Sequence, residues 1–303
     1  MNRRLSAYIL LLIVSIIWGV AGPVIKFTLG NFPPLIFLTY RFALSAVVAL
    51  IAFGFHRPRL PKKTGETVNV FIYGLLTSTV SLGLLFLGFD KTTALTGTLL
   101  SAAGPVFVAI AGVFFLHERV TKYERVGLSI AFIGTVVTIV EPIFDGNRGA
   151  FVTSIEGNLL VVTSLLVGVV LAVQGKLILR NHTSPSALTH ISFLIGCITI
   201  APIALYYHSL PEIISTIVTA PLSAHLGVWF MALLSGTLAY TLWHKGQKAI
   251  EISEVSVFTY LYPIWATPLA IFWLGETITP GFIAGAVVIA LGVVIAERKK
   301  RQN

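Results

Sequence analysis

The chain carries little formal charge for its length. Only 11% of its 303 residues are charged, whereas 56% are hydrophobic, and the mean hydropathy is +0.90. Soluble globular domains carry about 25% charged residues, so this composition excludes that class. It predicts an all-α integral membrane protein, because a helix satisfies its own backbone hydrogen bonds inside a bilayer.

Other absences restrict the chemistry. The single cysteine, Cys197, excludes a disulfide framework and a cysteine metal cluster. The chain also lacks the His-Glu-x-x-His and Gly-x-Ser-x-Gly motifs of hydrolases and the phosphate-binding loop of ATPases. We therefore expect no enzymatic activity, no cofactor and no metal site. An intramembrane enzyme and a receptor or assembly scaffold stay open as weaker alternatives.

Ten apolar segments are long enough to be membrane spans. A hydrocarbon core about 30 Å thick needs roughly 20 residues of helix. The segments cover residues 6–28, 33–55, 67–88, 92–115, 123–140, 155–178, 185–207, 223–247, 253–274 and 280–296. Little sequence lies between them, so we expect no sizeable soluble domain. The first segment is too long for a cleaved signal peptide, and we expect it to be retained.

Lysine and arginine gather on one side of the predicted bundle. If the N-terminus is cytoplasmic, all but four of the 21 Lys and Arg residues face the cytoplasm. The exceptions are Lys26, Lys91 and Arg148 on the other face and Arg41 within a span. This bias predicts a multi-pass protein of the plasma (inner) membrane with both termini cytoplasmic. The net charge of +9 then reflects orientation in the membrane, and we expect no nucleic-acid partner.

The sequence nearly repeats itself at a spacing of 158 residues. The matching positions include Pro105/Pro263, Glu118/Glu276, Thr121/Thr279, Gly127/Gly285 and Gly134/Gly292. An odd number of spans in each copy inverts one copy relative to the other, as in many alternating-access transporters. We therefore expect a first repeat over residues 1–149 and a second over 150–303, each with five helices.

The repeated residue types each have a structural explanation. Pro105 and Pro263 lie within predicted helices and predict kinks, with a second break at Pro268; these kinks are either fixed by packing or act as hinges. Glu118 and Glu276 either neutralise helix N-termini or form a gate or ion site. The repeated threonines are predicted N-caps, and the repeated glycines predict close helix packing.

Polar and aromatic side chains within the predicted spans mark a candidate cavity. Each hydroxyl alone is readily explained by a hydrogen bond between helices, so the group carries more weight than any member. The candidates are Ser15, Trp18, Thr77, Ser81, Ser101, Thr237, Tyr240, Tyr260 and Trp265. Aromatic walls with neutral hydroxyls suit a small organic solute. Trp18 either encloses that solute or packs between helices.

Arg41 is the one formally charged residue well inside a predicted span, and no Asp or Glu lies near the middle of any span. A buried arginine must be paired or face a cavity. Its partner is therefore either the Asp90 carboxylate, helix carbonyl groups or the acid group of a solute. Titration of His190 or His244 would couple transport to protons. The charge or gate candidates besides Arg41 are Lys26, Asp90, Lys176 and His244.

These features resemble the drug/metabolite transporter superfamily, specifically its ten-helix EamA-type members. The resemblance covers nearly the whole chain and rests on Trp18-Gly19 followed by Pro23 and Lys26, on Arg41-Phe42, and on the twice-repeated Pro, Glu and Gly. It implies two inverted five-helix repeats around a central cavity lined mainly by helices one, three, four, six, eight and nine. It also implies a secondary transporter that exports amino acids, other metabolites or drugs.

The sequence departs from internal symmetry at one position of this pattern. Gly168 stands in the sixth helix where Trp18 stands in the first, although Lys176 still matches Lys26. We therefore expect an asymmetric cavity inside a symmetric scaffold.

Overall fold

The computed structural model describes residues 3–55, 59–61, 63–108, 122–145, 154–181 and 183–297. Within these residues the chain is helical, and seven helical segments are long and apolar enough to cross a membrane. They are α1 (Arg3–Leu29), α2 (Pro34–Phe55), α3–η1–α4 (Thr64–Asp90), α8 (Ile155–Arg180), α9 (Pro185–Tyr207), α11–η2–α12 (Leu222–Ala249) and α13–η3–α14 (Ile252–Phe272). The all-α membrane fold is confirmed.

Three further helices occupy the remaining predicted spans. They are α5 (Ala94–Ala102), after which the described helical chain continues to Val108, α7 (Lys122–Asp145) and α15 (Pro280–Glu297). Each of the ten predicted segments thus contains a helix. The structure adds one short helix that the hydropathy pattern did not predict, α10 (Leu210–Thr219), between α9 and α11.

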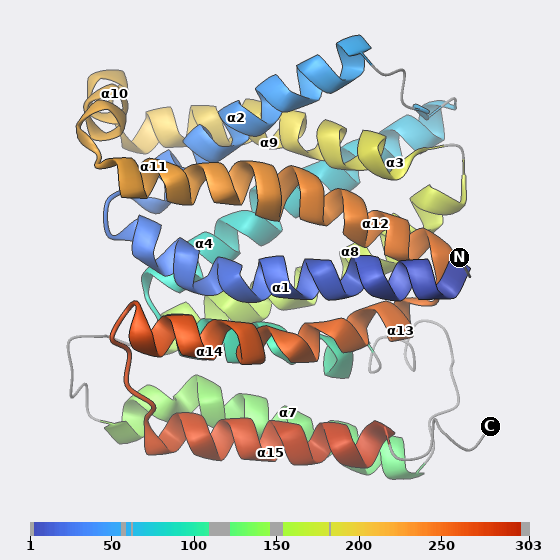
Figure 1. The fold of residues 1–303 in the computed structure, drawn as a ribbon, viewed down its shortest axis with the longest axis vertical. Coiled ribbons are helices and arrows are strands. Elements are labelled where there is room, and N and C mark those ends of the chain that lie inside the picture. The colour runs from blue at the N-terminus through green and yellow to red at the C-terminus, as the bar shows by residue number, and fades with distance from the viewer. Residues whose placement is uncertain are drawn as a thin grey trace.

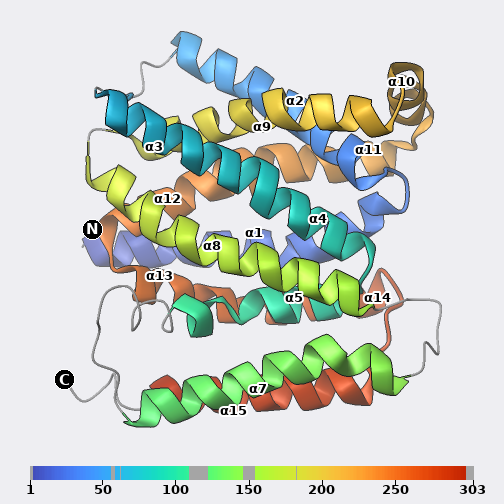
Figure 2. The ribbon, with the colours of Figure 1, turned by 180° about the vertical axis from the view of Figure 1, so that it is seen from behind.

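The helices form a layered bundle. In Figure 1, α1 runs across the near side between α12 and α14, and it packs against both. Figure 2 shows the opposite side, where α4 packs on α8 and α5 lies below them. The pair α2 and α9 covers one edge of the bundle, while α7 and α15 pack along each other at the other edge. The near and far layers therefore face each other across the centre of the bundle.

Local sequence explains where several helices begin. The side chains of Thr93, Ser154, Ser184 and Ser209 accept hydrogen bonds from backbone N–H groups in the first turns of α5, α8, α9 and α10. The Thr279 hydroxyl likewise accepts from the Phe282 N–H at 3.0 Å, which confirms the predicted cap of the tenth span. These caps satisfy N–H groups that a helix leaves unpaired.

The repeated glycines lie where α7 meets α15. A side chain at Gly134 would meet the backbone of Ile289, and one at Gly285 would meet Thr138. The predicted close packing of small residues is therefore confirmed at these two positions. Glu118 and Thr121, the first-repeat members of their pairs, lie outside the described residues.

Two helices are interrupted just before the repeated prolines. The fourth span breaks at a turn at Ala103, ahead of Pro105, and the ninth changes to the 3₁₀ helix η3 (Phe258–Leu261) ahead of Pro263. Both predicted breaks are present. The second break expected at Pro268 is not, because α14 continues through that residue to Phe272; one missing backbone hydrogen bond does not end this helix.

Glu276 sits at the beginning of α5. Its two carboxylate oxygens accept hydrogen bonds from the backbone N–H groups of Ala94 (2.6 Å) and Leu95 (2.9 Å). The preceding Gly275 adopts a φ of 71°, a left-handed conformation that glycine tolerates best. Burial raises the pKa of the Glu276 carboxyl above its ordinary value, and the two N–H groups act against that rise. The structural explanation is thus confirmed for Glu276, which neutralises a helix N-terminus.

Candidate functional site

A cavity of about 250 Å³ lies at the centre of the bundle. Its walls come from α1, from α3 through α4, from α5 and the residues that follow it, from α8, from η2 and α12, and from α13 through α14. These are the six helices that the family resemblance implies. One residue of α2, Arg41, also lines the cavity.

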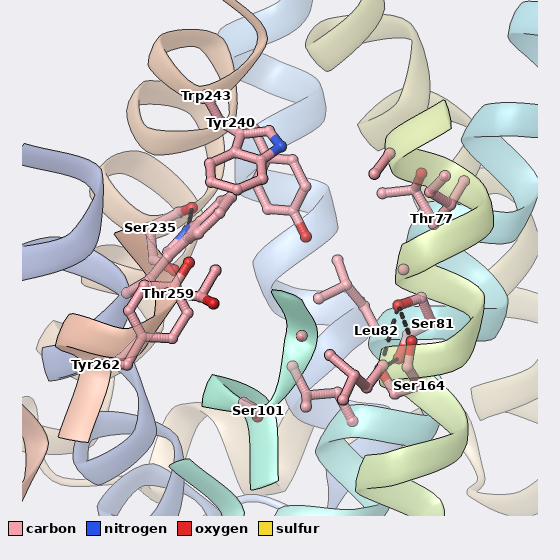
Figure 3. Close-up of a pocket in the computed structure, with 18 of the residues that line it drawn as sticks. Thr77, Ser81, Leu82, Ser101, Ser164, Ser235, Tyr240, Trp243, Thr259 and Tyr262 are labelled. Carbon is pink, nitrogen blue, oxygen red and sulfur yellow. Dashed lines mark hydrogen bonds between the residues drawn. The ribbon is translucent and has the colours of Figure 1, made fainter. Parts of the chain in front are cut away.

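One wall of the cavity is aromatic. The ring of Trp18 lies 5.0 Å from Tyr240, 5.1 Å from Trp243 and 6.3 Å from Tyr262, measured between ring centroids. The Trp18 indole N–H also donates to the main-chain oxygen of Ser235 at 2.9 Å. Figure 3 shows Tyr240, Trp243 and Tyr262 on one side of the cavity. Trp18 is therefore held in place by its neighbours and presents a fixed apolar surface.

The opposite wall is built from hydroxyl groups. Thr77 and Ser81 face the cavity from the third span, and Ser164 faces it from α8 (Figure 3). The Ser81 and Ser164 hydroxyl oxygens lie 3.1 Å apart, and the Ser164 hydroxyl donates to the Ser81 main-chain oxygen at 2.7 Å. One turn further along α8, Gly168 leaves open space, since a side-chain carbon there would meet no atom within 4 Å.

The third and the eighth spans become π-helical where they meet the cavity. The segment η1 (Leu75–Ser81) carries Thr77 and Ser81, and η2 (Phe230–Leu238) carries Ser235. The two segments overlap when the chain is shifted by its repeat spacing of 158 residues. π-Helical turns are rare and are frequently found at functional sites, so their presence in both repeats supports a functional role for these two walls.

Arg41 has no carboxylate partner among the described residues. Its side chain is 1% exposed, and its guanidinium carbon lies 5.3–5.9 Å from the ring centroids of Phe42, Phe86 and Phe193. Of the three partners considered for Arg41, the Asp90 carboxylate is wrong, because Asp90 lies exposed at the end of α4 while Arg41 is buried.

The predicted lysines bind helix ends instead of lining the cavity. Lys26 Nζ donates to the main-chain oxygens of Phe89 and Asp90, at 3.0 Å each. Lys176 Nζ donates to the main-chain oxygens of Gln247 and Ile250. Both ammonium groups thus sit at the C-terminal ends of helices, where cations are favourable.

The predicted histidines also lie outside the cavity wall. The two ring nitrogens of His244 are within 2.9 Å of the Tyr73 and Thr189 hydroxyl oxygens, and the residue is fully buried. His190 packs against the ring of Phe53 at 5.8 Å between centroids. A role for either histidine in proton coupling stays a prediction.

The structure divides the sequence-predicted cavity residues into two groups. Trp18, Thr77, Ser81, Ser101 and Tyr240 line the cavity; that they contact a solute stays a prediction. The other four lie off its wall. Ser15 and Thr237 donate to main-chain oxygens within their own helices, Trp265 packs against Gly19 of α1, and Tyr260 belongs to η3.

Several lining residues were missed at the level of sequence. They include Thr98, Ser164, Trp243, Gln247, Thr259 and Tyr262. Helical spacing contains a signal for two of them, because Tyr240, Trp243 and Gln247 follow one another at i, i+3 and i+7 and so share one face. Ser164 has no such signal, since only the packing of α8 on α4 brings it to Ser81.

The chain is similar to known transporters over nearly all of its length. The model of the EamA-like transporter family matches residues 5–140 and again residues 155–297. The chain is 28% identical to an uncharacterized transporter, YyaM, of Bacillus subtilis, covering 97% of this chain and 94% of that one. It is 27% identical to a protein of Salmonella typhimurium named a probable amino-acid metabolite efflux pump, covering 94% and 93%.

A solved crystal structure has the same fold. It superimposes with a TM-score of 0.68 at 16% identity, covering 98% of both chains. The two matches of the family model account for nearly all of the sequence. The chain belongs to the EamA-like transporter family.

Proposed function

We propose that this protein is a secondary transporter of the plasma (inner) membrane that exports a small organic solute, an amino acid or a similar metabolite, by alternating access. The cavity carries this proposal, because both repeats contribute walls to one space at the centre of the bundle. A carrier that exposes its site alternately to the two sides needs this arrangement.

The volume of the cavity supports a small solute. Small-molecule sites commonly measure roughly 300–1,000 Å³, and this one measures about 250 Å³. An amino acid therefore suits it better than a large drug. The Salmonella relative, named an amino-acid metabolite efflux pump, supports the same class of solute and the outward direction.

Reconstitution in liposomes tests transport itself. Full-length protein should produce saturable flux of at least one L-amino acid across the bilayer, and empty liposomes should not. Product formation or capture of a partner protein without any flux would instead favour an enzyme or a scaffold. Export is tested in cells fed a dipeptide, which raises the internal amino-acid concentration; cells that express the protein should release the amino acid faster than cells that do not.

The expected topology is tested by cysteine labelling. Figure 1 shows the start of α1 and the end of α15 on the same side of the bundle, which supports two termini on one face, and the charge bias favours the cytoplasmic one. In a Cys197→Ser background, a membrane-impermeant maleimide should label Asn31→Cys in intact cells and leave Leu60→Cys unlabelled. Labelling of Leu60→Cys alone would reverse the orientation.

A further inference from the structure

Arg41 differs from every other described residue on the cavity wall, because it alone carries a formal charge. It is also the largest fully buried side chain among the described residues. The rest of the wall is made of aromatic rings, aliphatic groups, hydroxyls and the Gln247 amide. One cation is therefore placed in an otherwise neutral chamber.

The hydrogen-bonding capacity of Arg41 is largely unused. A guanidinium group has five N–H donors, yet Nε and Nη1 donate to no atom of the described chain although both are buried. Burying a cation without an anion is strongly unfavourable, and an apolar residue at this position would avoid that cost. The unused donors therefore indicate an acceptor that arrives from outside the chain.

The aromatic neighbours attract the charge without supplying that acceptor. The guanidinium carbon lies 5.6 Å from the centroid of Phe42, 5.3 Å from Phe86 and 5.9 Å from Phe193. Such contacts stabilise a desolvated cation. They offer no oxygen to the N–H donors, whose planar fork matches the two oxygens of a carboxylate.

A chain of rings connects Arg41 to the aromatic wall. The Phe193 ring lies 5.4 Å from Tyr240, and the Tyr240 ring lies 5.0 Å from Trp18. Figure 3 shows Tyr240 extending into the space between the two walls. A solute with an acid group at Arg41 would thus place its remaining part beside Tyr240 and Trp18.

We infer that Arg41 receives the carboxylate of the transported solute, so that the substrates are small monocarboxylates or zwitterionic amino acids with an apolar part. This inference rests on the proposed transport function. A single buried cation matches one carboxylate, whereas a phosphate dianion would lack a second positive group on the described wall.

The test compares each acid with its own amide, which keeps the shape and removes the carboxylate charge. Flux into proteoliposomes is measured for the twenty L-amino acids and their amides, using the full-length wild type, Arg41→Gln, Arg41→Lys and the control Lys26→Met. For each acid that the wild type carries, the half-saturation concentration should be roughly 10- to 100-fold lower than for the amide, the range expected for hydrogen bonds to a charged group. Arg41→Gln should abolish that preference, Arg41→Lys should retain part of it, and Lys26→Met should keep it.

The possible failures are distinguishable. Saturable flux of amides equal to that of acids, or an undiminished acid preference in Arg41→Gln, would overturn the role of Arg41 and leave transport intact. No flux of any amino acid or amide would remove the proposed function and this inference with it. If Arg41→Gln does not fold, the wild-type acid-to-amide ratio and its reduction in Arg41→Lys decide the question.

Discussion

The two repeats agree at their lysines. Lys26 reaches a main-chain oxygen of Phe89 at the end of α4, and Lys176 reaches that of Gln247 at the end of α12. Phe89 and Gln247 are separated by 158 residues, the spacing of the repeat. A lysine thus binds the C-terminal end of a helix in each half.

The two repeats differ where they meet the cavity. Trp18 presents an indole ring, whereas Gly168, the matching residue of α8, leaves open space. Phe42 and Phe193 each lie eight residues after the proline that begins α2 or α9, and their ring centroids are 5.7 Å apart. The residue before Phe42 is Arg41, however, whereas the residue before Phe193 is a serine. Symmetry is thus kept in the scaffold and lost at the cavity wall, which suits the recognition of an asymmetric solute.

Restoring symmetry at Gly168 should have the largest effect. Gly168→Trp would place a second indole opposite Trp18 in a cavity of about 250 Å³, and a filled cavity cannot accept solute. We expect loss of detectable flux with normal expression and monodisperse protein. Gly168→Ala is the matched control, since open space surrounds the position, and it should keep most of the flux. Normal flux through Gly168→Trp would show that solute passes elsewhere.

Removing the indole of Trp18, which also makes the two repeats more alike at this position, should have a smaller effect on transport. Trp18→Ala deletes an aromatic surface that contacts Tyr240, Trp243 and Tyr262. Aromatic contacts contribute roughly 0.5–1.5 kcal/mol beyond area burial, so the half-saturation concentration should rise about tenfold, with broader acceptance of bulky solutes. The half-saturation concentration of Trp18→Phe should lie between those of the wild type and Trp18→Ala. Kinetics of flux at equal protein amount measure this, and unchanged values in both variants would make Trp18 a packing residue.

The helices could be predicted well from the sequence, because hydropathy, prolines and helix-capping residues act locally. The breaks before Pro105 and Pro263 follow from a missing N–H, and the cap at Thr279 follows from a hydroxyl next to a helix start. Glu276 was also readable, since a carboxylate between two spans has few partners other than a helix N-terminus.

The cavity was predicted less completely because side-chain direction depends on helix type and packing. The π-helical turns of η1 and η2 shift the faces that a regular period assigns. Thr237 consequently bonds Ala232 within η2 instead of facing the cavity. Arg41 illustrates the other limit: sequence showed that it needed an anion or a cavity, but only the bundle shows that Asp90 is out of reach.

The repeated prolines test whether the halves also share a motion. Pro105→Ala and Pro263→Ala restore an N–H to interrupted helices and should straighten them. If the breaks are hinges, each variant should lower the maximal flux several-fold and leave half-saturation nearly unchanged, because the chemistry of the wall is kept. Proteoliposome kinetics, with the amount of folded protein measured by size-exclusion chromatography, check this. A parallel loss of folded protein and flux would reduce both prolines to packing elements.

The lysines should give the smallest effect and the closest match between repeats. Lys26→Met and Lys176→Met each keep a long side chain and remove an ammonium group from a helix C-terminus, where a cation contributes roughly 0.3–2 kcal/mol. Both variants should therefore lower the midpoint of thermal unfolding in detergent by similar amounts. Neither lysine lines the cavity among the described residues, so half-saturation for transport should stay at its wild-type value. A changed half-saturation concentration in Lys26→Met alone would give Lys26 a part in the site, and the asymmetry of the cavity would then extend into the scaffold. Equal stability losses with unchanged kinetics would confine the asymmetry to the cavity walls, because the two halves would then differ only where solute binds.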